Sequence, residues 1–230
     1  MDNYQNAALG LKQVFSGKLW LTICETLSPI AYMAAWSFLG AGVWFFIAMY
    51  FFYFGRILFP AICAVGLYRM GKDIGTCKIA AALCFADVVA LVLKYILQSK
   101  GLDDFSYITY IAAQGIIMHD MYLKGVAAWI DITAGIVHYV APVLIVYFVC
   151  TSVGSVMKEL ENNEIAKFSR EVWIINLMTG ICYTIDSFLM WSIHTDWIKL
   201  ANFMAVIFYL RFLYRSYRAL SEQDKIEEAK

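Results

Sequence analysis

Four ionisable residues on two neighbouring apolar segments have types and spacings that could form a polar site inside a membrane. Asp87 and Lys94 lie seven residues apart on one segment. Asp131 and His138 repeat that spacing on the next segment. Seven residues make about two helical turns, so the members of each pair share one helix face. If the two helices are antiparallel, their rise of about 1.5 Å per residue places Asp87 opposite His138. The same count places Lys94 opposite Asp131.

Two interpretations of these matched depths stay open. An ionisable side chain in hydrocarbon costs several kcal/mol, so each one needs a partner or a function. A histidine beside a carboxylate gains and loses a proton near neutral pH, and Asp87 with His138 could therefore bind a proton, a cation or a small polar ligand. Alternatively, interhelical polar bonds worth about 0.6 to 2 kcal/mol would only fix how the helices dock.

A buried arginine adds a second polar feature. Arg56 lies in an aromatic-rich apolar run, roughly 20 Å before Arg69 at helical rise, too far to reach the cytoplasmic surface easily. By depth, its expected partner is Asp87 or Glu25, and Glu25 could also relay protons. The predicted ligand- or ion-binding residues are therefore Asp87, His138, Arg56, Lys94, Asp131 and Glu25.

Signatures of the common enzyme classes are absent from the sequence. We find no Walker A loop, no HExxH, no GxSxG and no paired-aspartate run of the prenyl-transferase kind. Of the three histidines only His138 lies deep in an apolar segment, so a haem with two histidine ligands is not expected. We predict no catalytic residue, no metal and no cofactor, and we favour a protein that is not an enzyme.

Composition identifies the broad class. The 230 residues are 62% hydrophobic and only 16% charged, with a mean hydropathy of +0.65. A soluble domain is nearer half apolar and a quarter charged. Formal net charge is zero, so no global field attracts nucleic acid. These values predict an all-α polytopic membrane protein that forms a single integral membrane domain over residues 1–230.

Six apolar segments are long enough to cross a bilayer, which takes about 20 residues. Ten Lys and Arg residues fall on one side and three on the other, so both termini are expected in the cytoplasm. Residues 105–118 are apolar but short, which favours a re-entrant or interfacial segment, and the acidic tail 221–230 is expected to fray. The predicted spans are 16–38, 43–68, 77–98, 126–155, 171–191 and 197–217.

Successive pairs of spans loosely resemble one another, as in a threefold repeat, which predicts three tandem helical hairpins. A charged stretch at 158–172 could bind a membrane partner, and small-residue spacings permit a homo-oligomer. A short chain with no cleavable signal sequence suggests a bacterial plasma membrane. We expect a protein that binds or translocates a small solute or ion in the lipid bilayer. The alternative is an accessory subunit or scaffold whose buried charges only fix helix packing.

Overall fold

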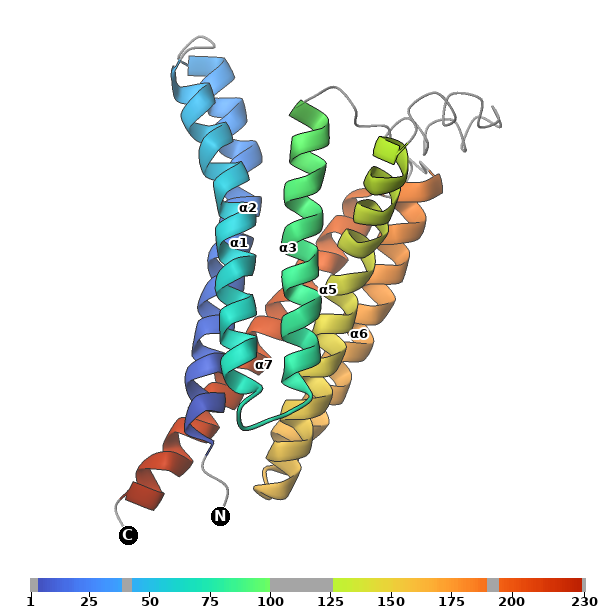
Figure 1. The fold of residues 1–230 in the computed structure, drawn as a ribbon. Helices are drawn as coiled ribbons and strands as arrows, with labels where there is room; N and C mark the ends of the chain where they lie inside the picture. The colour runs from blue at the N-terminus through green and yellow to red at the C-terminus, as the bar shows by residue number, and fades with distance from the viewer. Residues whose placement is uncertain (1–3, 39–42, 100–125, 190–194, 229–230) are drawn as a thin grey trace. The chain divides into compact units, whose positions relative to one another are not determined.

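The computed structural model describes residues 4–38, 43–99, 126–189 and 195–228, and within these ranges every regular element is an α-helix (Figure 1). The prediction of an all-α fold is thereby confirmed. Residues 105–118, predicted to be re-entrant or interfacial, lie outside the described residues. The six helices are α1 (Gln5–Phe38), α2 (Val43–Met70), α3 (Cys77–Ser99), α5 (Val126–Glu159), α6 (Asn163–Leu189) and α7 (Thr195–Glu228).

Two helices extend well beyond the predicted spans. α1 begins at Gln5, eleven residues before the predicted span, and no proline interrupts the preceding stretch. α7 continues to Glu228, so it includes most of the tail after residue 221 whose fraying stays a prediction. Its last turns consist mainly of good helix formers, and Arg218 Nε lies 2.9 Å from Glu222 Oε1 in an i,i+4 ion pair that supports the helix.

The charged stretch at 158–172 is a tight turn followed by the start of a helix. Glu161 has a φ of 59°, a left-handed conformation that lets the chain leave α5. The side-chain oxygen of Asn162 accepts a hydrogen bond from the backbone N–H of Ile165 at 3.3 Å, which caps the first turn of α6.

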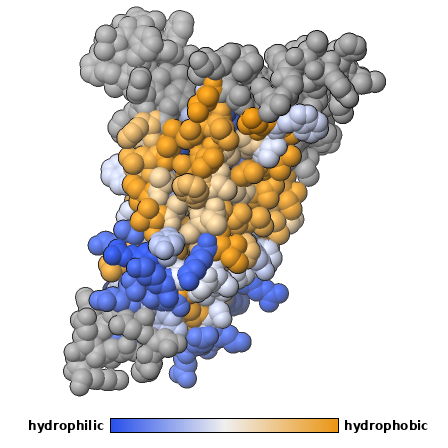
Figure 2. Space-filling model, viewed as in Figure 1, coloured by the Kyte–Doolittle hydropathy of each residue, from blue (hydrophilic) through white to orange (hydrophobic). Residues whose placement is uncertain are grey.

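Three helices contain stretches long and apolar enough to cross a membrane. These are Cys77–Ile96, Ile132–Glu159 and Trp197–Gln223, found among the described residues. Large hydrophobic side chains also lie open on the surface: Phe85, Trp129 and Trp197 are between 65% and 72% exposed. Figure 2 shows hydrophobic side chains gathered along the described helices on the face in view. Soluble monomers rarely present so much apolar surface, whereas a lipid-facing helix does.

The described helices divide into two compact units. Unit 1 comprises Met1–Ala81 with Leu213–Lys230, and unit 2 comprises Ala82–Phe212. Unit 1 is built on the α1–α2 pair. Unit 2 is built on α5 and α6, two helices that the hairpin prediction assigned to different hairpins. The three-hairpin arrangement therefore stays a prediction.

Small residues let α1 and α2 pack closely in unit 1. A Cβ added at Gly66 would lie 2.8 Å from the carbonyl oxygen of Gly10, closer than real Cβ atoms approach. A Cβ added at Gly17 would lie 2.7 Å from Cys63 Sγ. Further along, a Cβ at Gly55 would lie 3.3 Å from Cys24 Sγ. Residue numbers in these contacts rise along α1 while they fall along α2, so the two helices form an antiparallel hairpin.

A carboxylate from the α2–α3 turn closes the other end of this hairpin. Asp73 Oδ2 accepts a hydrogen bond from the backbone N–H of Ala7 at 2.7 Å, and its Oδ1 accepts one from Asn6 Nδ2 at 3.0 Å. Ala7 lies in the first turn of α1, where backbone N–H groups have no partner inside the helix. Asp73 therefore caps α1 from 66 residues away along the chain.

Unit 2 uses the same close packing between α5 and α6. Gly154 of α5 faces Ser169 of α6, whose hydroxyl donates to the carbonyl of Ala166 at 2.7 Å. Nearby, the rings of Tyr147 and Trp173 meet edge to face with centroids 5.2 Å apart. These contacts hold α5 and α6 as one antiparallel pair that supports the site on α5.

The close approach at Gly66 yields a testable prediction. Gly66→Ala should lower the free energy of unfolding by about 1 to 3 kcal/mol, because the new methyl group forces α1 and α2 apart. Gly75→Ala is the matched control, since nothing lies within 4 Å of a Cβ added there. The measurement is thermal unfolding of both variants in the same detergent. Equal stability of the two variants would contradict close packing at this crossing.

Candidate functional site

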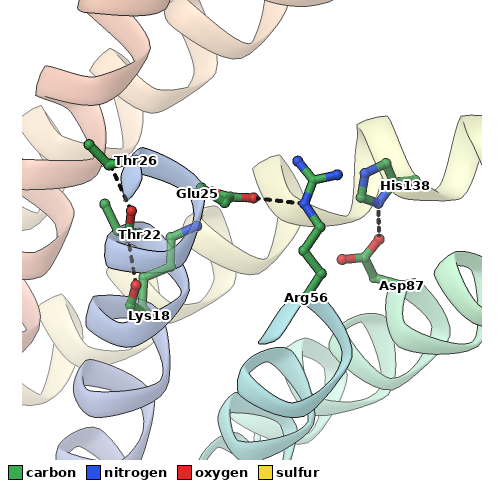
Figure 3. Close-up of polar contacts among 7 residues, drawn as sticks. All are labelled: Lys18, Thr22, Glu25, Thr26, Arg56, Asp87 and His138. Carbon is green, nitrogen blue, oxygen red and sulfur yellow. Dashed lines mark hydrogen bonds and ion pairs between the residues drawn. The ribbon is translucent and has the colours of Figure 1, made fainter. Parts of the chain in front are cut away.

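Asp87 and His138 form a direct hydrogen bond between α3 and α5 in unit 2. His138 Nδ1 lies 2.8 Å from Asp87 Oδ1, and Figure 3 shows the two side chains pointing at each other. The pairing predicted from matched depths is therefore confirmed. Both helices rise by about 1.5 Å per residue, so the number of residues from each membrane edge correctly predicts which side chains meet.

Small or apolar buried residues surround the pair on both helices. Cys84 and Leu91 lie one turn before and after Asp87 on α3, and both are buried. Ala134 and Ala141 flank His138 in the same way on α5, and they are buried too. The polar pair thus lies on the inward faces of apolar helices, where an isolated charge would be costly.

The pair itself is only partly covered. The Asp87 side chain is 14% exposed and the His138 side chain is 37% exposed. Their mutual bond uses one carboxylate oxygen and one ring nitrogen, and it does not use Asp87 Oδ2 or His138 Nε2. A carboxylate oxygen and an imidazole nitrogen are groups that can hold a proton, and the oxygen can also contact a cation. The geometry therefore permits binding as well as helix docking.

A second charged pair lies in unit 1. Arg56 Nε on α2 is 3.7 Å from Glu25 Oε1 on α1, an ion pair that Figure 3 draws. Glu25 was one of the two partners expected for Arg56, and this pairing is confirmed. The close contact of Gly55 with Cys24 explains it, because their chain neighbours Arg56 and Glu25 are thereby brought to one level.

Hydroxyl groups near this pair bond within their own helix. Thr22 Oγ1 donates to the carbonyl oxygen of Lys18 at 2.8 Å, and Thr26 Oγ1 donates to that of Thr22 at 2.8 Å (Figure 3). A threonine that bonds back to the preceding turn needs no other polar partner, which suits an apolar environment. These residues therefore add no further group to the ion pair.

The other predicted pair is Lys94 with Asp131. Lys94 is half-buried on α3. The side chain of Asp131 lies outside the described residues. The expected pairing of Lys94 with Asp131 stays a prediction.

Sequence reasoning missed Asp73, whose two hydrogen bonds tie the α2–α3 turn to α1. An aspartate directly after a basic helix end was visible as a turn residue in the sequence. Its partners, Asn6 and Ala7, belong to a helix start that was placed too late in the chain. Because the first N–H groups of a helix have no acceptor within it, a start for α1 at Gln5 would have indicated that an acceptor such as Asp73 is needed there.

Among the described residues, no group of three or more His, Cys, Asp or Glu side chains could hold a metal ion. Comparisons with protein-family models, with curated proteins and with solved structures find no match.

A double-mutant cycle measures what the Asp87–His138 bond contributes. We expect Asp87→Ala and His138→Ala to be non-additive, with a coupling of about 0.6 to 2 kcal/mol in the free energy of unfolding. The reference cycle pairs Asp87→Ala with Glu171→Ala, an exposed residue of α6, and should be additive. Thermal unfolding in detergent reports both cycles. If the first cycle is as additive as the second, the bond does not stabilise the protein.

Proposed function

We propose that this chain is a polytopic membrane protein with six membrane-spanning helices and both termini in the cytoplasm. Three helices with apolar stretches of spanning length and the exposed aromatic side chains support a place in the bilayer. The asymmetric distribution of Lys and Arg supports the orientation. The plasma membrane of a bacterial cell is the proposed location.

We further propose that Asp87 and His138 bind a proton or a small cation, which the protein translocates or senses. The single observation that carries this proposal is their 2.8 Å bond on apolar helices, with the pair still partly exposed. The imidazole of His138 and the carboxylate of Asp87 are both groups that can carry a proton. A cation could instead contact the carboxylate, with His138 neutral beside it.

A scaffold or accessory subunit is the second candidate, and one observation favours it. Both polar pairs, Glu25–Arg56 and Asp87–His138, join two helices, as pairs that serve only packing would do. In that case the charged turn between α5 and α6 is the surface for a partner. The two candidates differ in whether Asp87 must be able to ionise.

Asp87→Asn separates ionisation from helix docking. The amide oxygen of asparagine still accepts a hydrogen bond from His138, so the contact and the fold should persist, but the amide carries no titratable proton. We expect purified protein in liposomes to dissipate an imposed pH or sodium gradient. Asp87→Asn should reduce the flux to the background of empty liposomes, as read by a pH-sensitive or sodium-sensitive dye.

The matched control is Glu171→Gln, an acid-to-amide change at an exposed position of α6, which should leave the flux unchanged. Circular dichroism of each variant checks the fold. A wild-type protein that moves neither protons nor sodium would contradict translocation of these ions. Equal flux from the wild-type protein and Asp87→Asn would show that Asp87 does not carry it.

A further inference from the structure

The turn between α2 and α3 carries a cluster of cations that the site described above does not use. Arg69, Lys72 and Lys78 lie within ten residues, and Lys72 and Lys78 are exposed. A Cβ added at Gly71 would lie 2.5 Å from Lys78 Cγ, so the lysine stem crosses directly over this glycine. The missing side chain at Gly71 thus brings Lys78 beside the segment that holds Arg69 and Lys72.

The nearest acid, Asp73, forms no ion pair with this cluster in the described part of the chain. Asp73 directs both carboxylate oxygens to α1, where they accept hydrogen bonds from Asn6 and the Ala7 backbone. Within the part of the chain that the structure describes, Arg69, Lys72 and Lys78 form no ion pair with a carboxylate. Their positive charges are therefore available to an anion from outside.

Exposed apolar side chains lie directly beside these cations. Val65 and Tyr68, one turn apart on α2, are 61% and 64% exposed, and Ile79 next to Lys78 is 48% exposed. Along α2 the order is aliphatic, then aromatic, then basic. This is the order in which a bilayer presents acyl chains, the interface and phosphates, and tyrosine prefers the interface.

We propose that Arg69, Lys72 and Lys78 bind the phosphate of an anionic phospholipid headgroup, with Tyr68 at the level of the interface and Val65 against its acyl chain. An acidic protein or a nucleic acid would satisfy the charges but leave the adjoining apolar surface in water. A lipid satisfies both at once. Basic residues next to a membrane attract anionic lipids in this way.

The geometry of unit 1 adds a fourth cation to the same end. Lys12 is exposed on α1, two residues beyond Gly10, which packs against Gly66 of α2. Within this unit, Figure 1 shows the start of α1 beside the end of α2. Lys12 therefore adds positive charge to this end of unit 1, but two residues of helix turn it by about 200° from the face that packs on α2, so it is not one of the residues proposed to hold the phosphate.

The α5–α6 turn provides a matched reference. Residues 158–171 carry Lys158, Lys167 and Arg170, as many cations as the α2–α3 turn, but they also carry four glutamates. Lys158 and Lys167 are exposed, like Lys72 and Lys78. Removing two lysines from either turn changes the total charge of the protein equally, so only a local site distinguishes the two changes.

The test is native mass spectrometry of the full chain in detergent, titrated with phosphatidylglycerol or with phosphatidylcholine. We expect the wild-type protein to prefer phosphatidylglycerol. Lys72→Gln with Lys78→Gln should weaken phosphatidylglycerol binding at least roughly tenfold and leave phosphatidylcholine binding unchanged. Lys158→Gln with Lys167→Gln should bind like the wild-type protein.

Three outcomes would overturn the proposal: no preference for phosphatidylglycerol, an equal loss in both double variants, or complete displacement of the lipid by excess inorganic phosphate. The last would mean that the turn recognises phosphate alone.

The inference rests on the membrane location proposed above but not on ion binding. Retention in phosphatidylcholine nanodiscs tests the membrane location separately, and Asp87→Asn should bind phosphatidylglycerol normally.

Discussion

Pairing of ionisable side chains on apolar helices is the constraint on which the rest of this structure depends. An unpaired carboxylate at the position of Asp87 or Glu25 would have a free-energy cost larger than the stabilisation that one typical helix contact provides. In the structure each has a basic partner on another helix, at 2.8 Å from His138 and 3.7 Å from Arg56. The level of one helix against its neighbour is therefore fixed by charge as well as by packing.

Small residues make one of these pairings possible. Gly10, Gly17 and Cys24 recur every seven residues on α1 and meet Gly66, Cys63 and Gly55 on α2. Without Cβ atoms at the glycines the two backbones come close, and Cys63 Sγ reaches the carbonyl of Val14 at 3.6 Å. This seam determines the level at which Glu25 and Arg56 face each other. Packing and electrostatics thus specify the same register.

The exposed apolar side chains and the polar contacts belong to different faces of the same helices. Phe85 is open to the surroundings while Asp87, two residues later, bonds to His138. At 100° per residue such neighbours point in clearly different directions. A helix can therefore present hydrocarbon to a bilayer on one side and a titratable pair to its neighbour on the other, which is what an ion-binding membrane protein or a docked subunit requires.

The sequence by itself determined the all-α fold, the approximate positions of the six described helices and the pairing of Asp87 with His138. These follow from apolar runs, from uniform helical rise and from the cost of a lone charge, all of which are local. Only the tertiary structure decided that Asp73 caps α1, that Arg56 meets Glu25, and that α5 packs most closely on α6. The last two depend on which side chains are small where two helices cross, and the cap depends on which turn lies beside the start of α1; hydropathy encodes neither. The early start of α1 and the long α7 escaped prediction because polar helical turns beyond a span look like solvated ends.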